Sequence, residues 1–444
     1  MSASALVAGA VPLPTQPAVS AEIQQYFDKN VLMKDRVRHS FSMKQAAGDK
    51  DTVDCIQDDS PPPPVPPSLP TVIPPSSLPP VPGLLSNTAQ DGTMDSLGRI
   101  RNCPAGTFAQ VRPSISNLVP YRTVAEWKAA VAPLSVQTPG HDHVSAGQYV
   151  NNWGMWSDIS FEKPSLNYRG IDPYPAYEFS NTQLWLIGHY HEPNQPRFSD
   201  QQTIEPGWMN ETNGSPVVRL FASYAGYSSF CYDAQCWDYG VIHWRSATGF
   251  VFGASVPVAP PGSFPNHGSF GIYGSKTDGY WYVYVINQWA GYFWFDSGPL
   301  SRTNVMSGAA PASYLAVGAE VYEGYQGSAP PGTIHPYIQM GMGNLPTVYS
   351  TDYSNMLNSA FAACNFYLDG TATWRVALPA TSISRIVGCI WIAGACIPQI
   401  ATWVGLDRPD CYKGQVISNY QPPTTTPYLL LGGPGPNGSA CTTY

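Results

Sequence analysis

The chain has 444 residues and a net charge of −8, and only 12% of its residues are charged, about half the usual share for a soluble protein. No block of Lys or Arg accumulates, so the electrostatic attraction that binding to nucleic acid or to an anionic membrane requires is missing. We therefore expect neither as a partner. The hydrophobic share of 43% supports a large core, and the aromatic share of 13% implies that Tyr and uncharged polar residues cover much of the surface.

Residues 1–140 differ in texture from the rest of the chain. The first 22 residues contain an apolar stretch and small residues near Ala21, but no Lys or Arg precedes them, so an ordinary signal peptide is not evident. The apolar residues of the next segment have roughly helical spacing and predict a short amphipathic helix: Ile23, Phe27, Val31 and Val37. Residues 61–83 then hold 12 prolines, which favour an extended polyproline II spacer.

Beyond residue 140 the sequence predicts antiparallel sheet. Short aromatic and β-branched runs alternate along the chain, as in residues 281–286, and Gly, Pro, Asn and Asp separate them. The longest apolar run, Ile386 to Ile397, is too short to cross a bilayer and is interpreted as a buried strand pair or hairpin. The fold class expected is an all-β, antiparallel β-sandwich over residues 141–415. An irregular, proline-rich region precedes it, and a flexible tail, 416–444, follows.

The nine cysteines lack the paired spacing of a structural zinc site, so disulfides are the better interpretation. Three asparagines open N-x-Ser/Thr sequons and agree with a secretory route as glycosylation sites: Asn210, Asn213 and Asn437. No signal for a metal or another cofactor is found. His189 and His191, like His141 and His143, have strand spacing, but no third ligand lies nearby, so polar residues on a wet strand face are the favoured interpretation.

Two acids stand in stretches that suit catalysis. Glu205 lies in "QQTIEPGW", between hydrogen-bonding side chains and a rigid, bulky trio, and Glu320 lies in "YLAVGAEVYEG" among small and aromatic residues. An isolated glutamate in a β-rich protein is usually solvated. Two acids on neighbouring strands in a partly dry cleft cannot both ionise easily, so such a pair would act as an acid and a base together at low pH.

The order of several motifs resembles that of the neprosin family, secreted glutamic peptidases with a β-sandwich catalytic domain behind an N-terminal activation region. The motifs run from about Val53 to Gly414: "CPAGTFAQVRPS", "HDHVSAGQYV", "EFSNTQLWLIG", "QQTIEPGW", "RLFASYAGYSSFCYDAQCWDYGVI", "AVGAEVYEG", "YIQMGMGNLP" and "DCYKG". The resemblance implies that Glu205 and Glu320 form the catalytic pair, with Glu323 as the competitor for the second place. It also implies an activation region within residues 1–140 and endopeptidase cleavage after proline.

The resemblance further implies a disulfide between Cys231 and Cys236. A second bridge would join Cys411 to Cys364, Cys389 or Cys396. Donors or substrate contacts around the pair are expected from residues in the family motifs: Gln183, Gln202, Gln339 and Trp208. The expected protein is a secreted monomer that acts on peptides or proteins.

Two rival functions from other classes stay open. A glycosidase would also place two carboxylates in an aromatic groove of a β-sandwich. A non-catalytic carbohydrate- or cell-wall-binding protein would use the same aromatic face, and the two acids would then be incidental.

Overall fold

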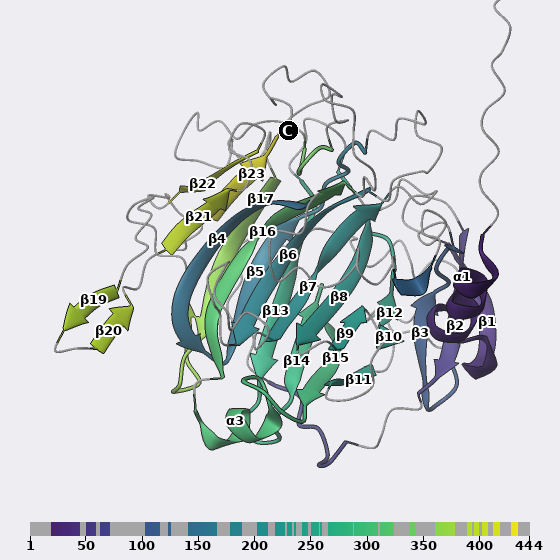
Figure 1. The fold of residues 1–444 in the computed structure, drawn as a ribbon, viewed down its shortest axis with the longest axis horizontal. Coiled ribbons are helices and arrows are strands. Elements are labelled where there is room, and N and C mark those ends of the chain that lie inside the picture. Colours follow the sequence, from purple (N-terminus) through teal and green to yellow (C-terminus); the bar gives the residue numbers. More distant parts are fainter. Residues whose placement is uncertain are drawn as a thin grey trace, which may run out of the picture.

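The computed structural model describes the part of the chain that carries its regular structure. The described residues are 19–44, 50–58, 63–71, 103–115, 123–125, 141–166, 178–188, 202–211, 218–226, 229–232, 235–236, 242–246, 250–256, 258–259, 265–286, 288–309, 311–323, 338–342, 360–377, 389–392, 395–398, 402–406, 412–417 and 428–433. Most of them belong to strands of antiparallel sheets, so the prediction of an all-β, sandwich-like fold is confirmed (Figure 1).

The first large sheet is built from eight strands in the order β10-β9-β8-β7-β6-β16-β4-β21. Their bounds, in chain order, are β4 His141–Asn152, β6 Glu178–Gly188, β7 Gln202–Glu211, β8 Arg219–Gly226, β9 Ser229–Tyr232, β10 Gln235–Cys236, β16 Ala312–Glu323 and β21 Thr402–Leu406.

The second large sheet has the order β11-β15-β14-β13-β5-β17-β23-β22, with β18 paired to β17. Its strands are β5 Gly154–Ser160, β11 Ile242–Ser246, β13 His267–Gly274, β14 Trp281–Val285, β15 Gln288–Phe295, β17 Ala360–Leu368, β18 Trp374–Val376, β22 Lys413–Ile417 and β23 Tyr428–Gly432. A short helix, α3 (Arg302–Ser307), follows β15.

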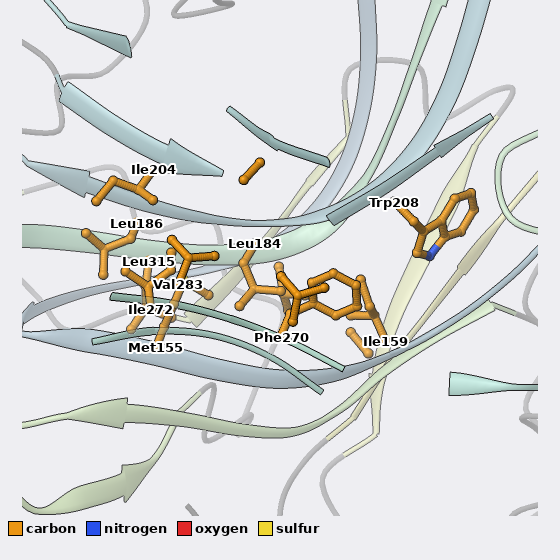
Figure 2. Packing of buried hydrophobic residues seen from close by; sticks show 14 of the residues in the cluster. Met155, Ile159, Leu184, Leu186, Ile204, Trp208, Phe270, Ile272, Val283 and Leu315 are labelled. Carbon is orange, nitrogen blue, oxygen red and sulfur yellow. The ribbon is translucent and has the colours of Figure 1, made fainter. Parts of the chain in front are cut away.

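The main core lies between these two sheets. Along each strand, alternate side chains point to opposite faces, and the apolar set of each sheet is turned toward the other sheet. Figure 2 shows Leu184, Leu186, Ile204 and Leu315 of the first sheet against Met155, Phe270, Ile272 and Val283 of the second. All eight are at most 2% exposed, so burial fixes the strand register firmly.

The N-terminal region is more regular than predicted. Ile23, Phe27 and Val31 lie on one buried face of α1 (Ala21–Tyr26) and the π-helical turn Phe27–Val31, which confirms that part of the predicted helix. Val37 does not belong to it, because a 3-10 turn, Lys34–Arg36, intervenes and Val37 begins β1.

A four-stranded sheet accounts for most of the remaining regular N-terminal structure. Its order is β1-β2-β3-β12, with bounds β1 Val37–Lys44, β2 Lys50–Gln57, β3 Thr107–Val111 and β12 Val251–Phe252. The last strand comes from the sandwich part of the chain and pairs in parallel with β3. The N-terminal region is therefore joined to the sandwich by backbone pairing, and Figure 1 shows this sheet with α1 at one side of the sandwich.

Disulfide Cys55–Cys103 links β2 to the residues before β3. The two cysteines are 48 residues apart and enclose the proline-rich stretch, so the bridge closes this stretch into a loop. Its presence fits an oxidising compartment. Among the described helices, none is long and apolar enough to cross a membrane.

Two predictions for the C-terminal third can be compared with the structure. The run Ile386 to Ile397 contains a hairpin, as predicted, in which β19 (Cys389–Ile392) pairs with β20 (Ala395–Pro398). The prediction of a flexible tail after residue 415 is wrong in part, because β23 is paired between β17 and β22. Its side chains at residues 428–431 are fully buried.

We predict that removing β23 abolishes folding. Each of its four buried large side chains contributes about 1.5–3 kcal/mol through burial, and the sum is comparable with the whole stability of a typical domain, about 5–15 kcal/mol. A chain truncated after Ile417 should lack a cooperative thermal unfolding transition. A chain truncated after residue 434, which keeps β23, is the matched control and should unfold like the full chain. A cooperative transition in the shorter truncation would show that β23 is dispensable.

Candidate active site

Glu205 and Glu320 lie on the outer face of the first sheet. Along β7, Ile204 and Trp208 point into the core, so Glu205 faces outward. Along β16, the odd-numbered residues 315–321 point into the core, so Glu320 also faces outward. β6 separates the two strands and is antiparallel to both. Two acids 115 positions apart in the chain are thus brought to one face of three neighbouring strands.

Gln183 of β6 bridges the two carboxylates. Its side-chain Nε2 donates to Glu205 Oε2 and to Glu320 Oε2, each at 3.3 Å. The two oxygens are therefore separated by no more than about twice that distance. The sequence predicted both acids and Gln183 as site residues, and the structure brings all three together.

Glycines stand on both sides of Gln183 in the sheet, and each packs closely against a neighbouring strand. Gly207 of β7 and Gly318 of β16 stand opposite Gln183 in the sheet register, one on each side. A Cβ at Gly207 would come within 2.6 Å of the Gln183 Cβ, and one at Gly318 within 2.1 Å of the Val144 carbonyl oxygen. Each glutamate is two residues from one of these glycines, a spacing that the sequence analysis did not use.

Glu320 is the more enclosed of the two glutamates and is surrounded by donors. It is 3% exposed, whereas Glu205 is partly exposed. Its Oε2 also accepts from Asn181 Nδ2 at 3.3 Å, and its own backbone N–H donates to Asn181 Oδ1 at 3.2 Å. His143 Nε2 lies 3.4 Å from Glu320 Oε1. Hydrogen-bond donors and a protonated imidazole both stabilise an ionised carboxylate.

Asn181 and His143 are site residues that the sequence analysis missed. His143 was interpreted as a polar residue on a wet strand face, but the β4–β16 register puts it opposite Glu320. His143 lies in "HDHVSAGQYV" and Asn181 in "EFSNTQLWLIG", two motifs of the neprosin resemblance. Their place in these motifs is the sequence signal that could have identified them. His189 and His191, interpreted in the same way, lie outside the described residues.

Aromatic side chains flank the polar centre along the same face. One cluster lies toward the Asn181 side and contains Phe179, Met209, Phe221 and Tyr322. The other contains Ile187, Tyr314 and Ala316, with Tyr149 and Trp185 packed against it. The members of the first cluster are buried, and so are Ile187, Tyr314 and Ala316, so Tyr149 and Trp185 are the members of these clusters with partly exposed aromatic surface.

Two predicted substrate contacts point elsewhere. Trp208 is fully buried in the core, where its Nε1 donates to the Ser160 carbonyl, and Figure 2 shows its ring between the sheets. Gln202 is also fully buried, and it links β7 to the loop at Ser297 and Leu300. Both predictions are corrected by strand alternation, because even-numbered positions of β7 face the core.

The remaining predicted site residues have varied placements. The side-chain Oε1 of Gln339 accepts from the backbone N–H of Ser165, which connects two loops. Asn210 is buried, and its Nδ2 donates to the Pro164 carbonyl, so its amide is not accessible to a glycan in this fold. Glu323, the competitor of Glu320, is the last residue of β16. Asn213 and Asn437 lie outside the described residues.

The structure describes the backbone of one of the predicted cysteine pairs. Cys231 of β9 and Cys236 of β10 are directly opposite in a hairpin, a position that suits a bridge, and the bridge itself stays a prediction. Cys364 is buried in β17 and is not disulfide-bonded to any described residue. Cys411 lies outside the described residues, so its pairing is untested.

Glu162 is a buried carboxyl with a raised pKa. Glu162 follows β5 and is 3% exposed, and its Oε1 has no hydrogen-bond partner. Burial raises the pKa of Glu162 to about 7, against the lowering effect of a hydrogen bond from Ser160. The described residues contain no group of three His, Cys, Asp or Glu that could hold a metal ion.

Comparison with known proteins adds no family assignment: no family model matches the chain, and no curated protein matches it either. The arrangement of the site therefore carries the functional argument.

We predict that Glu162 makes the fold more stable in acid. Below pH 4.5 its carboxyl is protonated in both the folded and the unfolded chain, and between pH 4.5 and about 7 only the unfolded chain loses the proton. Stability from this group is therefore lost as pH rises through that window, by about 3 kcal/mol. Glu162→Gln removes the titration, so chemical denaturation at pH 4 and pH 7.5 should show a smaller loss in the variant. Equal losses in both proteins would contradict the assignment.

Proposed function

We propose that this protein is a glutamic endopeptidase in which Glu205 and Glu320 hydrolyse peptide bonds through an activated water. The observation that carries the proposal is the sharing of one amide group by two carboxylates, through Gln183 Nε2. Paired acids on a partly enclosed face are suited to exchanging protons with a water and a substrate. The order of the sequence motifs, which resembles that of the neprosin family, supports the same assignment.

The surroundings of the two glutamates favour different roles. Glu320, with donors from Asn181, Gln183 and His143, is the better stabilised carboxylate and acts as the general base. Glu205 is partly exposed and acts as the general acid in its protonated form. Glu320 takes a proton from the water while the water oxygen bonds to the scissile carbonyl carbon. Glu205 gives its proton to the leaving nitrogen as the C–N bond breaks.

Gln183 has a second use in this scheme. In the structure its Nε2 donates to both glutamates. Protonation of Glu205 weakens the hydrogen bond that it accepts from Gln183 Nε2. The Gln183 N–H can then donate to the carbonyl oxygen of the substrate, on which negative charge develops. General acid–base catalysis supplies about 10²–10⁴-fold, so donors of this kind are needed for the rest of the rate.

The substrate class follows from the face around the pair. The partly exposed rings of Tyr149 and Trp185 can pack against apolar side chains of an extended peptide, and a proline ring packs well on aromatic side chains. Cleavage after proline is the preference that the family resemblance implies. Secretion and action at acid pH agree with disulfide Cys55–Cys103 and with a fold stabilised in acid by Glu162.

Carbohydrate turnover is the alternative. The bound on the separation of the two Oε2 atoms is compatible with a retaining glycosidase, whose carboxyls are about 5–5.5 Å apart. A carbohydrate-binding protein would need the aromatic face but not the acids. Parallel assays with proline-containing peptides and with plant cell-wall oligosaccharides separate the first alternative from the proposal, and loss of binding versus loss of turnover in Glu205→Gln separates the second.

We predict that Glu205→Gln and Glu320→Gln each fold normally and lose nearly all peptide turnover, at least about 10³-fold, because each change keeps the shape but removes a proton exchange. The double variant should be little worse than either single variant, since the two glutamates act as a unit. Turnover of a quenched fluorescent peptide at acid pH measures this.

The matched control is Glu323→Gln, three positions from Glu320 on the same strand, which should keep turnover near that of the wild type. Activity retained by Glu320→Gln but lost by Glu323→Gln would give the second catalytic place to Glu323. Turnover retained by Glu205→Gln would reject the dyad.

Control of this activity by residues 1–140 is part of the proposal. Acidic groups of the N-terminal segment pair with bases of the sandwich: Asp51 with Arg219 at 2.8 Å, and Asp58 with Arg245. These ion pairs help to hold the N-terminal segment against the sandwich. Arg219 lies on β8 and Arg245 on β11, so these contacts attach the N-terminal segment to both large sheets.

We predict that full-length protein at acid pH processes itself to a stable C-terminal fragment that contains the sandwich, with a parallel rise in activity. Glu205→Gln protein should stay intact under the same conditions, because cleavage depends on the dyad. Gel electrophoresis with N-terminal sequencing of the fragment, sampled alongside the peptide assay, measures both. Full activity of the uncut chain at neutral pH would show that no latent form exists.

A further inference from the structure

Part of the proline-rich stretch is bound to the outer face of the second sheet, on the side of the sandwich opposite Glu205 and Glu320. The backbone of Val65 is held by one tyrosine hydroxyl: its N–H donates to Tyr280 Oη at 3.0 Å, and Tyr280 Oη donates to its carbonyl at 2.8 Å. The Ser68 N–H is shared between Tyr282 Oη at 2.8 Å and Asp278 Oδ2 at 2.9 Å. These contacts join segments more than 200 residues apart in the chain.

The spacing of the two held residues fits a polyproline helix. Such a helix has three residues per turn, so residues i and i+3 face the same side. Val65 and Ser68 are three apart, and within residues 61–68 they alone are not proline and so alone carry backbone N–H groups. The site therefore recognises the two positions at which a proline-rich chain can donate a hydrogen bond.

The surface under the segment is preorganised. Tyr280, Tyr282, Tyr292 and Trp294 form one buried cluster against which Val65 packs. Tyr280 stacks on Tyr292 with ring centroids 4.9 Å apart. Tyr282 Oη donates to Asp278 Oδ2 at 2.6 Å, which fixes the hydroxyl that accepts from Ser68. Burial and this hydrogen bond to Asp278 raise the pKa of Tyr282, so its hydroxyl remains protonated.

The bound segment contributes little apolar surface of its own. Val65 is half-buried, whereas Pro64, Pro66, Pro67 and Ser68 are exposed. Recognition therefore depends on the backbone, on one aliphatic side chain and on the extended shape, and these properties are shared by many proline-rich sequences. The same stretch repeats the pattern of an aliphatic residue, two prolines and a further residue at 65–68, 73–76 and 78–81.

We propose that this tyrosine face is a binding site for proline-rich peptides of other polypeptides, with the pattern aliphatic-Pro-Pro-x, and that residues 63–71 are its internal ligand. Aromatic surfaces with fixed hydroxyls bind polyproline chains efficiently because the ligand is already extended and loses little entropy. The internal copy has an effective concentration on the order of millimolar, so it masks the site until it is displaced or cut away. This inference is independent of the proposed peptidase activity, since it uses the opposite face of the sandwich.

The test uses full-length protein and a fluorescein-labelled peptide with the sequence of residues 61–70, PPPPVPPSLP. Val65→Pro/Ser68→Pro in the protein deletes both N–H donors of the internal ligand and leaves the tyrosine face unchanged. Fluorescence anisotropy should show that this released variant binds the peptide at least tenfold more tightly than the wild type does. Val65→Pro alone should give an intermediate affinity, which keeps the test valid if the double variant is poorly folded.

Matched controls identify the surface. In the released variant, Tyr280→Phe should weaken binding about three- to tenfold, as expected for lost hydroxyl hydrogen bonds. Tyr284→Phe, four residues further along the chain on β14 and in another cluster, should not weaken it. A peptide with proline in place of its Val and Ser should bind at least tenfold more weakly than the original. Absence of saturable binding by the released variants, or equal binding after Tyr280→Phe, would overturn the proposal.

Discussion

The positions of Glu205 and Glu320 depend on the register of three neighbouring strands, β7, β6 and β16. Burial of alternate residues such as Ile204, Leu184 and Val317 between the two sheets sets that register, because a slip by one residue would turn every apolar side chain outward. The same alternation turns both glutamates and Gln183 to the outer face. The packing of the core thus fixes the positions of the two glutamates and Gln183 on the outer face.

The sandwich has two outer faces with different chemistry. The face of the first sheet presents two acids, amides and His143 between aromatic clusters, whereas that of the second presents tyrosine hydroxyls over a stacked aromatic cluster. The first suits proton exchange and the second suits holding an extended chain. The N-terminal region is connected to the sandwich by strand pairing at β12, by ion pairs at Arg219 and Arg245, and by the tyrosine face. Release of the N-terminal region would therefore expose the tyrosine hydroxyls of the second face.

The electrostatic design of the fold favours acid. The buried Glu162 carboxyl has a pKa raised to about 7 by burial. Falling pH therefore strengthens the sandwich core through this carboxyl.

The sequence by itself determined the fold class, the N-terminal helix and the pairing of residues 386–397, because these follow from local periodicity and turn residues. It also singled out Glu205, Glu320 and Gln183 through their motifs. Only the tertiary structure decided that Trp208 and Gln202 face the core, that Asn181 and His143 surround Glu320, that residues 428–432 complete a sheet, and that the proline-rich stretch lies on Tyr280 and Tyr282. These outcomes depend on which strands become neighbours and in which register, and pairing between distant segments of the chain leaves no local pattern in the sequence.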